Sequence, residues 1–204
     1  NLIENNQIGK ISHATLNVDW CRPQRYYDLA DWRGSWLADG GVSTNQGIHY
    51  FDIARHLLGD FSYVFAIMRR LAVNIECEDY LNAFFHMKQG IPLDVRMTTA
   101  IRHQFEEASL TINGSKGTIK LYGVCCNKLD VLLIDKAKES FGEEVEMAYG
   151  YGHKKLFEIL INDNNDMNST KPTLLESFKT MQFIYSCSDS AISGKKSFPQ
   201  NKYD

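Results

Sequence analysis

Four polar residues between positions 45 and 56 are spaced so that they could form one face of a catalytic helix. Asn45, His49, Asp52 and His56 lie four, three and four residues apart, and residues at this spacing are neighbours along one side of an α-helix. An imidazole can accept or relay a proton near neutral pH, and a carboxylate can orient that imidazole. An amide can orient a hydroxyl group but cannot accept its proton. The pattern is therefore suited to acid–base chemistry on a substrate hydroxyl.

The same pattern has two other interpretations. Histidines on helices are most often surface residues or hydrogen-bonded structural residues, and spacing alone does not distinguish these roles from a catalytic one. A zinc site would use His49 and His56, but neither an HExxH motif nor a cysteine pair with ligand spacing accompanies them. The sequence therefore predicts no metal site, and it leaves a structural role for Asp52 open.

The helix that would carry these residues has clear boundary signals. A glycine pair at positions 40 and 41 predicts a sharp turn, and Ser43 or Thr44 is expected as the N-cap. Gly59, followed by Asp60, is expected to end the helix. The predicted helix therefore starts directly after a turn, which is a common arrangement at the wall of an active site.

Residues 21–41, which precede this helix, form a long connection rich in aromatic residues, arginine, aspartate and glycine. Connections of this length inside a compact domain are uncommon and often functional. One interpretation is a surface loop whose aromatic residues, such as Tyr26 and Trp36, pack onto the core. Ligand contact is the other interpretation, because the loop leads into the helix with His49. The residues involved would be Arg22, Tyr26, Tyr27, Trp32 and Arg33.

The remaining sequence predicts an α+β fold, with a large, mostly antiparallel or mixed β-sheet and helices packed on one face. Residues 1–8 resemble the end of a helix, and further helices are predicted at 153–162 and 172–192. The hairpin of the two strands around position 114 is expected to turn at Asn113-Gly114. Short turns between successive strands favour antiparallel pairing. Strands are predicted at residues 10–20, 61–75, 79–88, 92–103, 106–112, 117–122 and 129–135.

Length and composition fit a single domain, residues 1–204, of ordinary globular character. The chain is 44% hydrophobic and 12% aromatic, and its net charge of −3 gives no sign of nucleic-acid binding. No apolar run approaches the length of a membrane span. Five cysteines without framework spacing fit a reducing cytoplasm. Cys125 and Cys126 are expected in a strand, where adjacent side chains point to opposite faces and are poorly placed to bridge.

Several short motifs, in order, resemble the substrate domain of the Gfo/Idh/MocA oxidoreductases. The main signature is W-R-G-x-W at 32–36, D-G-G at 39–41, N-Q-G-I-H-Y-x-D at 45–52 and L-L-G-D at 57–60. The R-P-x-x-Y-Y motif at 22–27 resembles the corresponding motif of one branch of the family, which oxidises UDP-N-acetylglucosaminuronic acid at C3. Further matches are I-G-K-I at 8–11, N-G-S-K-G-T at 113–118, G-H at 152–153 and S-G-K at 193–195.

This resemblance implies the substrate-binding half of an NAD- or NADP-dependent sugar dehydrogenase, with a role in lipopolysaccharide or polysaccharide biosynthesis. His49 matches the active-site histidine of the family, and Asn45 stands where inositol dehydrogenases have aspartate, which favours the sugar-nucleotide branch. Arg22 and Arg33 would meet a uronate carboxylate or a diphosphate, and Trp32 would contact the cofactor. In the family the uncovered face of the sheet builds dimers and tetramers, so a homo-oligomer is expected.

Two features of the family are missing from this sequence. It contains neither a G-x-G-x-x-G fingerprint nor the Glu-Lys-Pro segment that carries the principal catalytic lysine of the family. The expectation is a C-terminal substrate-binding and oligomerisation domain without its N-terminal Rossmann domain, inactive in isolation and without a bound cofactor. The rival hypothesis is a non-catalytic module that only oligomerises or regulates.

Overall fold

The fold is built on one large mixed sheet. The computed structural model describes residues 2–123, 125–134, 136–142, 152–162 and 173–200. Among these the strands run in the order β2-β3-β4-β1-β5-β6-β7-β8. Their bounds are β1 Ile11–Asp19, β2 Phe61–Arg69, β3 Tyr80–Met87, β4 Pro92–Thr98, β5 Glu107–Gly114, β6 Gly117–Tyr122, β7 Lys128–Leu133 and β8 Glu139–Gly142.

One pair of neighbouring strands in this sheet is parallel. Strands β1 and β4 run side by side in the same direction, with Val18 opposite Met97, whereas the other paired strands are antiparallel. The predicted α+β class with a mostly antiparallel, mixed sheet is confirmed.

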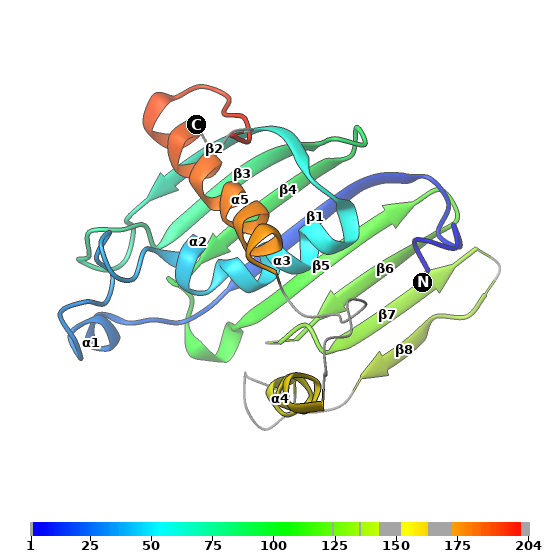
Figure 1. The fold of residues 1–204 in the computed structure, drawn as a ribbon, viewed down its shortest axis with the longest axis horizontal. Helices are drawn as coiled ribbons and strands as arrows, with labels where there is room; N and C mark the ends of the chain where they lie inside the picture. The colour runs from blue at the N-terminus through cyan, green and yellow to red at the C-terminus, as the bar shows by residue number, and fades with distance from the viewer. Residues whose placement is uncertain (1, 124, 135, 143–151, 163–172, 201–204) are drawn as a thin grey trace.

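Helices α3 and α5 lie across the same face of the sheet (Figure 1), as predicted. The helices are α1 Gln24–Tyr27, α2 Val42–Asn45, α3 Gly47–Leu58, α4 Gly152–Asn162 and α5 Leu174–Ser193, with a 3₁₀ turn η1 at His103–Phe105. Thr173 caps α5 by accepting the Glu176 N–H, and Gly194 ends it in the left-handed conformation. The helix predicted at 153–162 is confirmed, and so is the helix predicted at 172–192 from residue 174 onward; position 172 lies outside the described residues.

Four phenylalanine rings form the aromatic centre of the core between these helices and the sheet. Phe51 on α3, Phe183 on α5, and Phe61 and Phe85 on the sheet are almost fully buried. The ring centroids of Phe61 and Phe183 are 4.6 Å apart, and those of Phe51 and Phe85 are 5.8 Å apart. Aromatic pairs at such distances stabilise a fold beyond the area that they bury. This core fixes α3 on the sheet.

The opposite face of the sheet is not covered by any described element. Along β3 the side chains at positions 81, 83, 85 and 87 are buried in the core, whereas Phe84 is 39% exposed. Phe65 and Ile67 on the neighbouring strand β2 are also exposed on this side. An uncovered sheet face that carries aromatic side chains is typical of an interaction surface.

Several predicted boundaries are wrong, each for a local physical reason. Residues 2–8 form turns and not a helix end. The strand predicted over 61–75 ends at Arg69, because the buried Asp79 carboxylate accepts the backbone N–H groups of Leu71, Ala72 and Val73 and folds this segment into a loop. The strand predicted over 92–103 ends at Thr98, and β8 was not predicted.

Two turns also differ from the prediction. The hairpin between β5 and β6 turns at residues 115 and 116, because Gly114 and Gly117 still pair with each other. Cys125 and Cys126 lie in the turn after β6 and not in a strand, and neither forms a disulfide.

Candidate active site

The predicted single helix from residue 43 is two helices, α2 and α3, which meet at Gln46. Neither Ser43 nor Thr44 is the N-cap, because Gly41 occupies that position and no side chain caps it. Gly59 ends α3 at a φ of 78°, as predicted. A glycine at position 47 lets α3 approach the Met97 side chain of β4 closely.

A buried carboxylate holds the start of α2. Glu78 Oε1 accepts the backbone N–H of Ser43 at 3.0 Å and its hydroxyl at 2.5 Å. A side chain at Gly41 would overlap the Glu78 carboxyl group, so this position requires glycine. Burial raises the pKa of Glu78 above its ordinary value, although the hydrogen bonds from Ser43 oppose this shift. Glu78 therefore fixes the turn from which the candidate catalytic helix starts.

Asn45, the last residue of α2, is held by the preceding loop. Its Nδ2 donates to Asp39 Oδ1, and its Oδ1 accepts from Gln46 Nε2 at 2.7 Å. The other oxygen of Asp39 accepts the backbone N–H of Gly34 at 2.7 Å. Asp39 thereby ties the loop that carries Trp32 and Arg33 to Asn45.

His49, Asp52 and His56 all lie exposed on α3. These three residues share the helix face that the sequence predicts, and this face does not pack into the core. Asn45, which the sequence places on the same face, ends the separate helix α2. Asp52 Oδ1 accepts the hydroxyl of Thr180 on α5 at 2.6 Å. A structural role for Asp52 between the two helices is thus visible, and its role in orienting His49 stays a prediction.

A buried arginine completes the link between α3 and α5. Arg55 Nε donates to Thr180 Oγ1 at 3.2 Å, and its guanidinium also pairs with Glu176. Glu176 in turn is 3.1 Å from Lys179 Nζ, and the pKa of its carboxyl is lowered mainly by the hydrogen bond from Arg55. This network holds the exposed face of α3 in a fixed position relative to α5.

The predicted ligand-binding residues of the loop form an alternating stack of rings and guanidinium groups, which we call the arginine–aromatic stack. The Arg22 guanidinium carbon lies 4.6 Å from the Trp20 ring centroid and 5.0 Å from that of Tyr26. The Arg33 carbon lies 4.1 Å from the Tyr26 centroid and 4.8 Å from that of Trp32. Each contact is within the range of cation–π attraction. The stack fixes both arginines in place before any ligand arrives.

Both arginines of the stack retain hydrogen-bonding capacity. The Nε atoms of Arg22 and Arg33 are buried and lack a partner. Arg22 Nη1 donates to the Cys21 carbonyl at 2.7 Å and lies 3.8 Å from Glu106 Oε1. Buried polar atoms without a partner are uncommon and usually indicate a ligand or a water molecule. Two pre-oriented guanidinium groups are suited to binding an anion.

Tyr27 is a buried residue that packs against the Tyr26 ring of the stack. Its ring packs edge-on against Tyr26 with centroids 5.1 Å apart, and its hydroxyl is 3.3 Å from Thr99 Oγ1. Burial raises the pKa of the Tyr27 phenol. The Tyr27 side chain is buried, and its predicted contact with the substrate stays a prediction.

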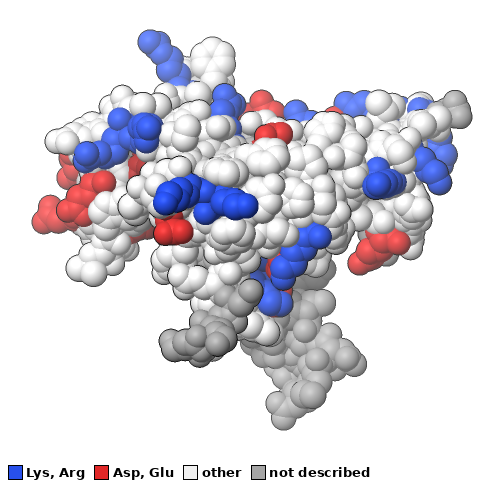
Figure 2. Space-filling view, turned by 90° about the horizontal axis from the view of Figure 1, so that it is seen from above, with Lys and Arg blue, Asp and Glu red and all other residues white. Residues whose placement is uncertain are grey.

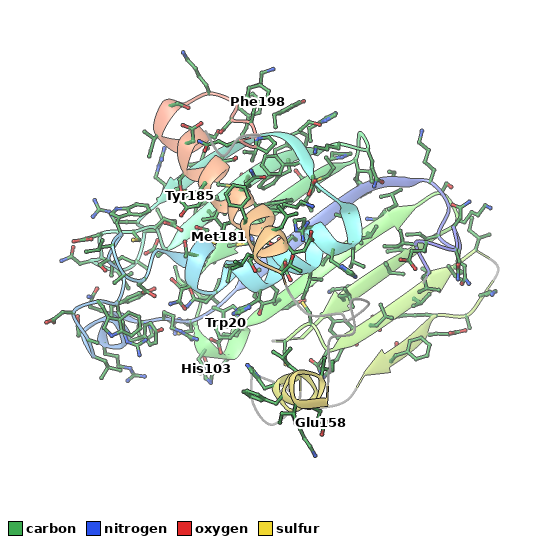
Figure 3. The ribbon with its side chains drawn as sticks, viewed as in Figure 1. Trp20, His103, Glu158, Met181, Tyr185 and Phe198 are labelled. Atoms are coloured by element: carbon green, nitrogen blue, oxygen red, sulfur yellow. The ribbon has the colours of Figure 1, made fainter. Side chains whose placement is uncertain are left out.

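A hydrogen bond connects the stack to α3. The Trp20 indole, which lies at the end of β1 (Figure 3), donates its Nε1–H to the Tyr50 hydroxyl at 3.2 Å. Because Tyr50 follows His49 directly, the stack and the exposed imidazole are parts of one local structure.

Three residues of this site, Trp20, Asp39 and Glu78, are not among those that the sequence predicts. Asp39 alone had a sequence signal, the Asp-Gly-Gly motif at 39–41.

The candidate site consists of side chains that can exchange protons or bind anions. Among the described residues, no group of three or more His, Cys, Asp and Glu side chains could hold a metal ion. His103, predicted in a strand, lies in η1 and pairs with Glu106 at 2.5 Å. In the part of the chain that the structure describes, no helix is long and apolar enough to cross a membrane.

Comparison with known proteins identifies the family. A family model described as GFO/IDH/MocA C-terminal domain matches residues 1–120. The chain belongs to this family, and the predicted resemblance is confirmed.

Two solved structures are similar over nearly the whole chain. The WlbA dehydrogenase from Bordetella pertussis, in complex with NADH and UDP-GlcNAcA, is 31% identical, with a TM-score of 0.84 over 98% of this chain and 60% of that one. The WlbA enzyme from Chromobacterium violaceum, also in complex with NADH and UDP-GlcNAcA, is 30% identical, with a TM-score of 0.81 over 99% of this chain and 58% of that one. The chain thus spans less than two thirds of the length of either protein.

Two further matches share the fold at low identity or cover only part of this chain. A levoglucosan dehydrogenase in complex with NADH shares the fold at 18% identity, with a TM-score of 0.82 over 98% of this chain and 62% of that one. The D-apiose dehydrogenase of Rhizobium rhizogenes (strain K84 / ATCC BAA-868) is 33% identical over 91 residues, which are 42% of this chain and 26% of that protein.

Proposed function

We propose that this chain is the substrate-binding domain of an NAD-dependent dehydrogenase that oxidises a hydroxyl group of a nucleotide sugar, UDP-N-acetylglucosaminuronic acid at C3. The arrangement that carries this proposal is the exposed His49 on α3 together with the pre-oriented guanidinium groups of Arg22 and Arg33, whose stack is connected to α3 by the hydrogen bond from Trp20 to Tyr50. The two similar structures at 31% and 30% identity, both complexes with UDP-GlcNAcA, support the substrate class.

Substrate recognition in this proposal uses the negative charges of the substrate. Its uronate carboxylate and its diphosphate are acceptors for Arg22 and Arg33, whose Nε–H groups lack protein partners. Tyr26 lies between the two guanidinium groups and keeps them apart. Binding would therefore satisfy buried donors that are otherwise unpaired, which favours anionic over neutral sugars.

In the proposed reaction His49 accepts or relays the proton that the substrate hydroxyl loses. Its exposed position on α3 leaves the imidazole accessible to a ligand. The Asn45 amide orients the hydroxyl, since its own geometry is fixed by Asp39 and Gln46. Asp52 keeps α3 in register with α5 through Thr180.

The cofactor would be bound mainly outside the described residues. The Trp32 indole is 48% exposed, so it offers a surface for contact with a cofactor ring. When bound, the nicotinamide of NAD supplies the acceptor for the hydride that leaves the substrate carbon. The open face of the sheet, with Phe65, Ile67 and Phe84, would join copies of the chain into a dimer or tetramer.

The test is a substrate comparison on the protein encoded by the complete parent reading frame. NADH formation is measured with UDP-N-acetylglucosaminuronic acid and, as the control, with UDP-N-acetylglucosamine, which lacks the carboxylate. We expect turnover of the uronate alone, and Arg33→Ala should raise KM for it. Equal turnover of both sugars, or turnover of neither, would refute the proposed substrate.

A further inference from the structure

A cavity of about 410 Å³ lies between the end of β2, the segment before β3 and the C-terminal half of α5. None of the residues proposed for catalysis or substrate contact lines this cavity. Its volume lies within the usual range for small-molecule sites. The lining residues used below are Trp36, Met68, Arg69, Arg70, Glu78 and Ile192.

One wall of this cavity is apolar and aromatic. The Trp36 side chain is 59% exposed, and its backbone N–H is held by Glu76 Oε2 at 3.0 Å. Met68 and the 86% exposed Ile192 continue the apolar surface on the β2 and α5 sides. An exposed indole beside aliphatic side chains is a suitable surface for stacking a planar ring.

Two adjacent arginines supply positive charge at the same cavity. Arg69 donates one Nη1–H to the Met68 carbonyl, and Arg70 donates one to the Ile75 carbonyl, both at 2.8 Å. Within the part of the chain that the structure describes, neither guanidinium forms an ion pair with a carboxylate. Their remaining N–H groups are available to an anion. The face of the molecule seen in Figure 2 carries scattered charges of both signs.

A buried carboxyl group lies behind the cavity wall. Glu78 is 2% exposed, and its Oε2 atom has no hydrogen-bond partner, although its Oε1 accepts two bonds from Ser43. This oxygen faces the backbone of Gly41 and has almost no accessible surface. The cavity therefore offers a ligand a ring surface and an anion site.

We propose that this cavity binds a nucleoside phosphate. The base stacks on Trp36, and the phosphate pairs with Arg70 and Arg69. The same chemistry is offered by a free nucleotide and by the nucleotide end of a nucleotide sugar. The proposal does not depend on catalysis by His49.

The test is calorimetric titration of the 204-residue chain with UMP, with uridine and inorganic phosphate as separate probes. We expect one saturable UMP site, with weaker binding of uridine and of phosphate alone. Arg70→Ala and Trp36→Ala should each weaken UMP binding about tenfold, which is the effect of one charge-assisted hydrogen bond or one stacking contact. Lys136→Ala, which removes an exposed cation beyond β7, should leave Kd unchanged.

Melting temperatures of all variants show whether each is folded. If Arg70→Ala does not fold, Trp36→Ala still tests the proposal. No UMP binding at roughly 10 mM, or equal binding by wild type, Trp36→Ala and Arg70→Ala, would overturn the proposal. Loss of UMP binding in Arg33→Ala alone would also overturn it, because the nucleotide would then occupy the arginine–aromatic stack. Competition between UMP and UDP-N-acetylglucosaminuronic acid identifies the substrate as the source of the nucleotide, and independent binding identifies a free nucleotide.

Discussion

Replacement of His49 by alanine tests the central assignment, and the structure gives the expected magnitude for both stability and rate. His49 is exposed on α3 and the aromatic core lies on the other side of that helix. Exposed substitutions away from caps and buried networks usually change the free energy of unfolding by no more than about 0.5 kcal/mol. Alanine also favours helix formation. We therefore expect an almost unchanged melting temperature for His49→Ala.

The effect on rate should be far larger. A positioned acid–base group typically contributes about 100-fold to 10,000-fold, which is about 2.7 to 5.5 kcal/mol in the activation free energy. His49→Asn should not restore activity, since an amide does not accept the proton. The assay measures NADH formation by the complete dehydrogenase with UDP-N-acetylglucosaminuronic acid, on the same preparations that give the melting temperature.

His56→Ala is the matched control for this experiment. His56 is also an exposed imidazole on α3, seven residues from His49. Its loss should leave turnover within about twofold of wild type, the range of a change with no catalytic role. Unchanged turnover per folded molecule in His49→Ala would remove His49 from the active site. Equal losses in both variants would point to a general effect on the helix and not to catalysis.

Three further predictions follow from other parts of the structure. The isolated chain should neither bind NAD tightly nor turn over a sugar, because its sequence has no glycine-rich phosphate-binding turn; calorimetric binding in the low-micromolar range would contradict this. The chain should self-associate, and Phe84→Lys on the open sheet face should shift sedimentation toward a monomer, whereas Leu174→Lys on α5, at a position 92% exposed, should not; a wild-type monomer at high micromolar concentration would exclude assembly through the sheet. Burial raises the pKa of Glu78 above its ordinary value of 4.5, so the folded protein binds this proton more tightly than the unfolded chain does. Stability should therefore fall as pH rises from 4.5 through the folded-state pKa, and Glu78→Gln should lose less stability over that window in urea titrations; identical pH profiles of the two proteins would refute this.

Much of the site could be predicted because its signals are local. The spacing of His49, Asp52 and His56 defines one helix face whatever the helix packs against, and the structure places all three exposed on α3. The loop residues Arg22, Tyr26, Trp32 and Arg33 were also correctly grouped, since short chain separations keep them close. How deeply Tyr27 is buried could not be predicted, because it depends on Thr99 across the fold.

The sequence by itself determined the elements that depend on near neighbours. Alternation of apolar and polar residues specified most strands, and the glycine at position 59 and the serine-glycine pair at 193–194 specified helix ends, because these features act through backbone geometry within a few residues. The family motifs are likewise contiguous in the chain. They were sufficient to identify the fold class and the family.

Tertiary structure alone decided the contacts that make these elements a site. Ser43 could cap its own helix, but Glu78, 35 residues further on, accepts both of its donors, and this changes where α2 begins. The parallel pairing of β1 with β4 and the bond from Trp20 to Tyr50 likewise join distant segments. Such contacts depend on which surfaces the buried core brings together. Local propensity carries no information about that choice, because many pairings satisfy the same local pattern.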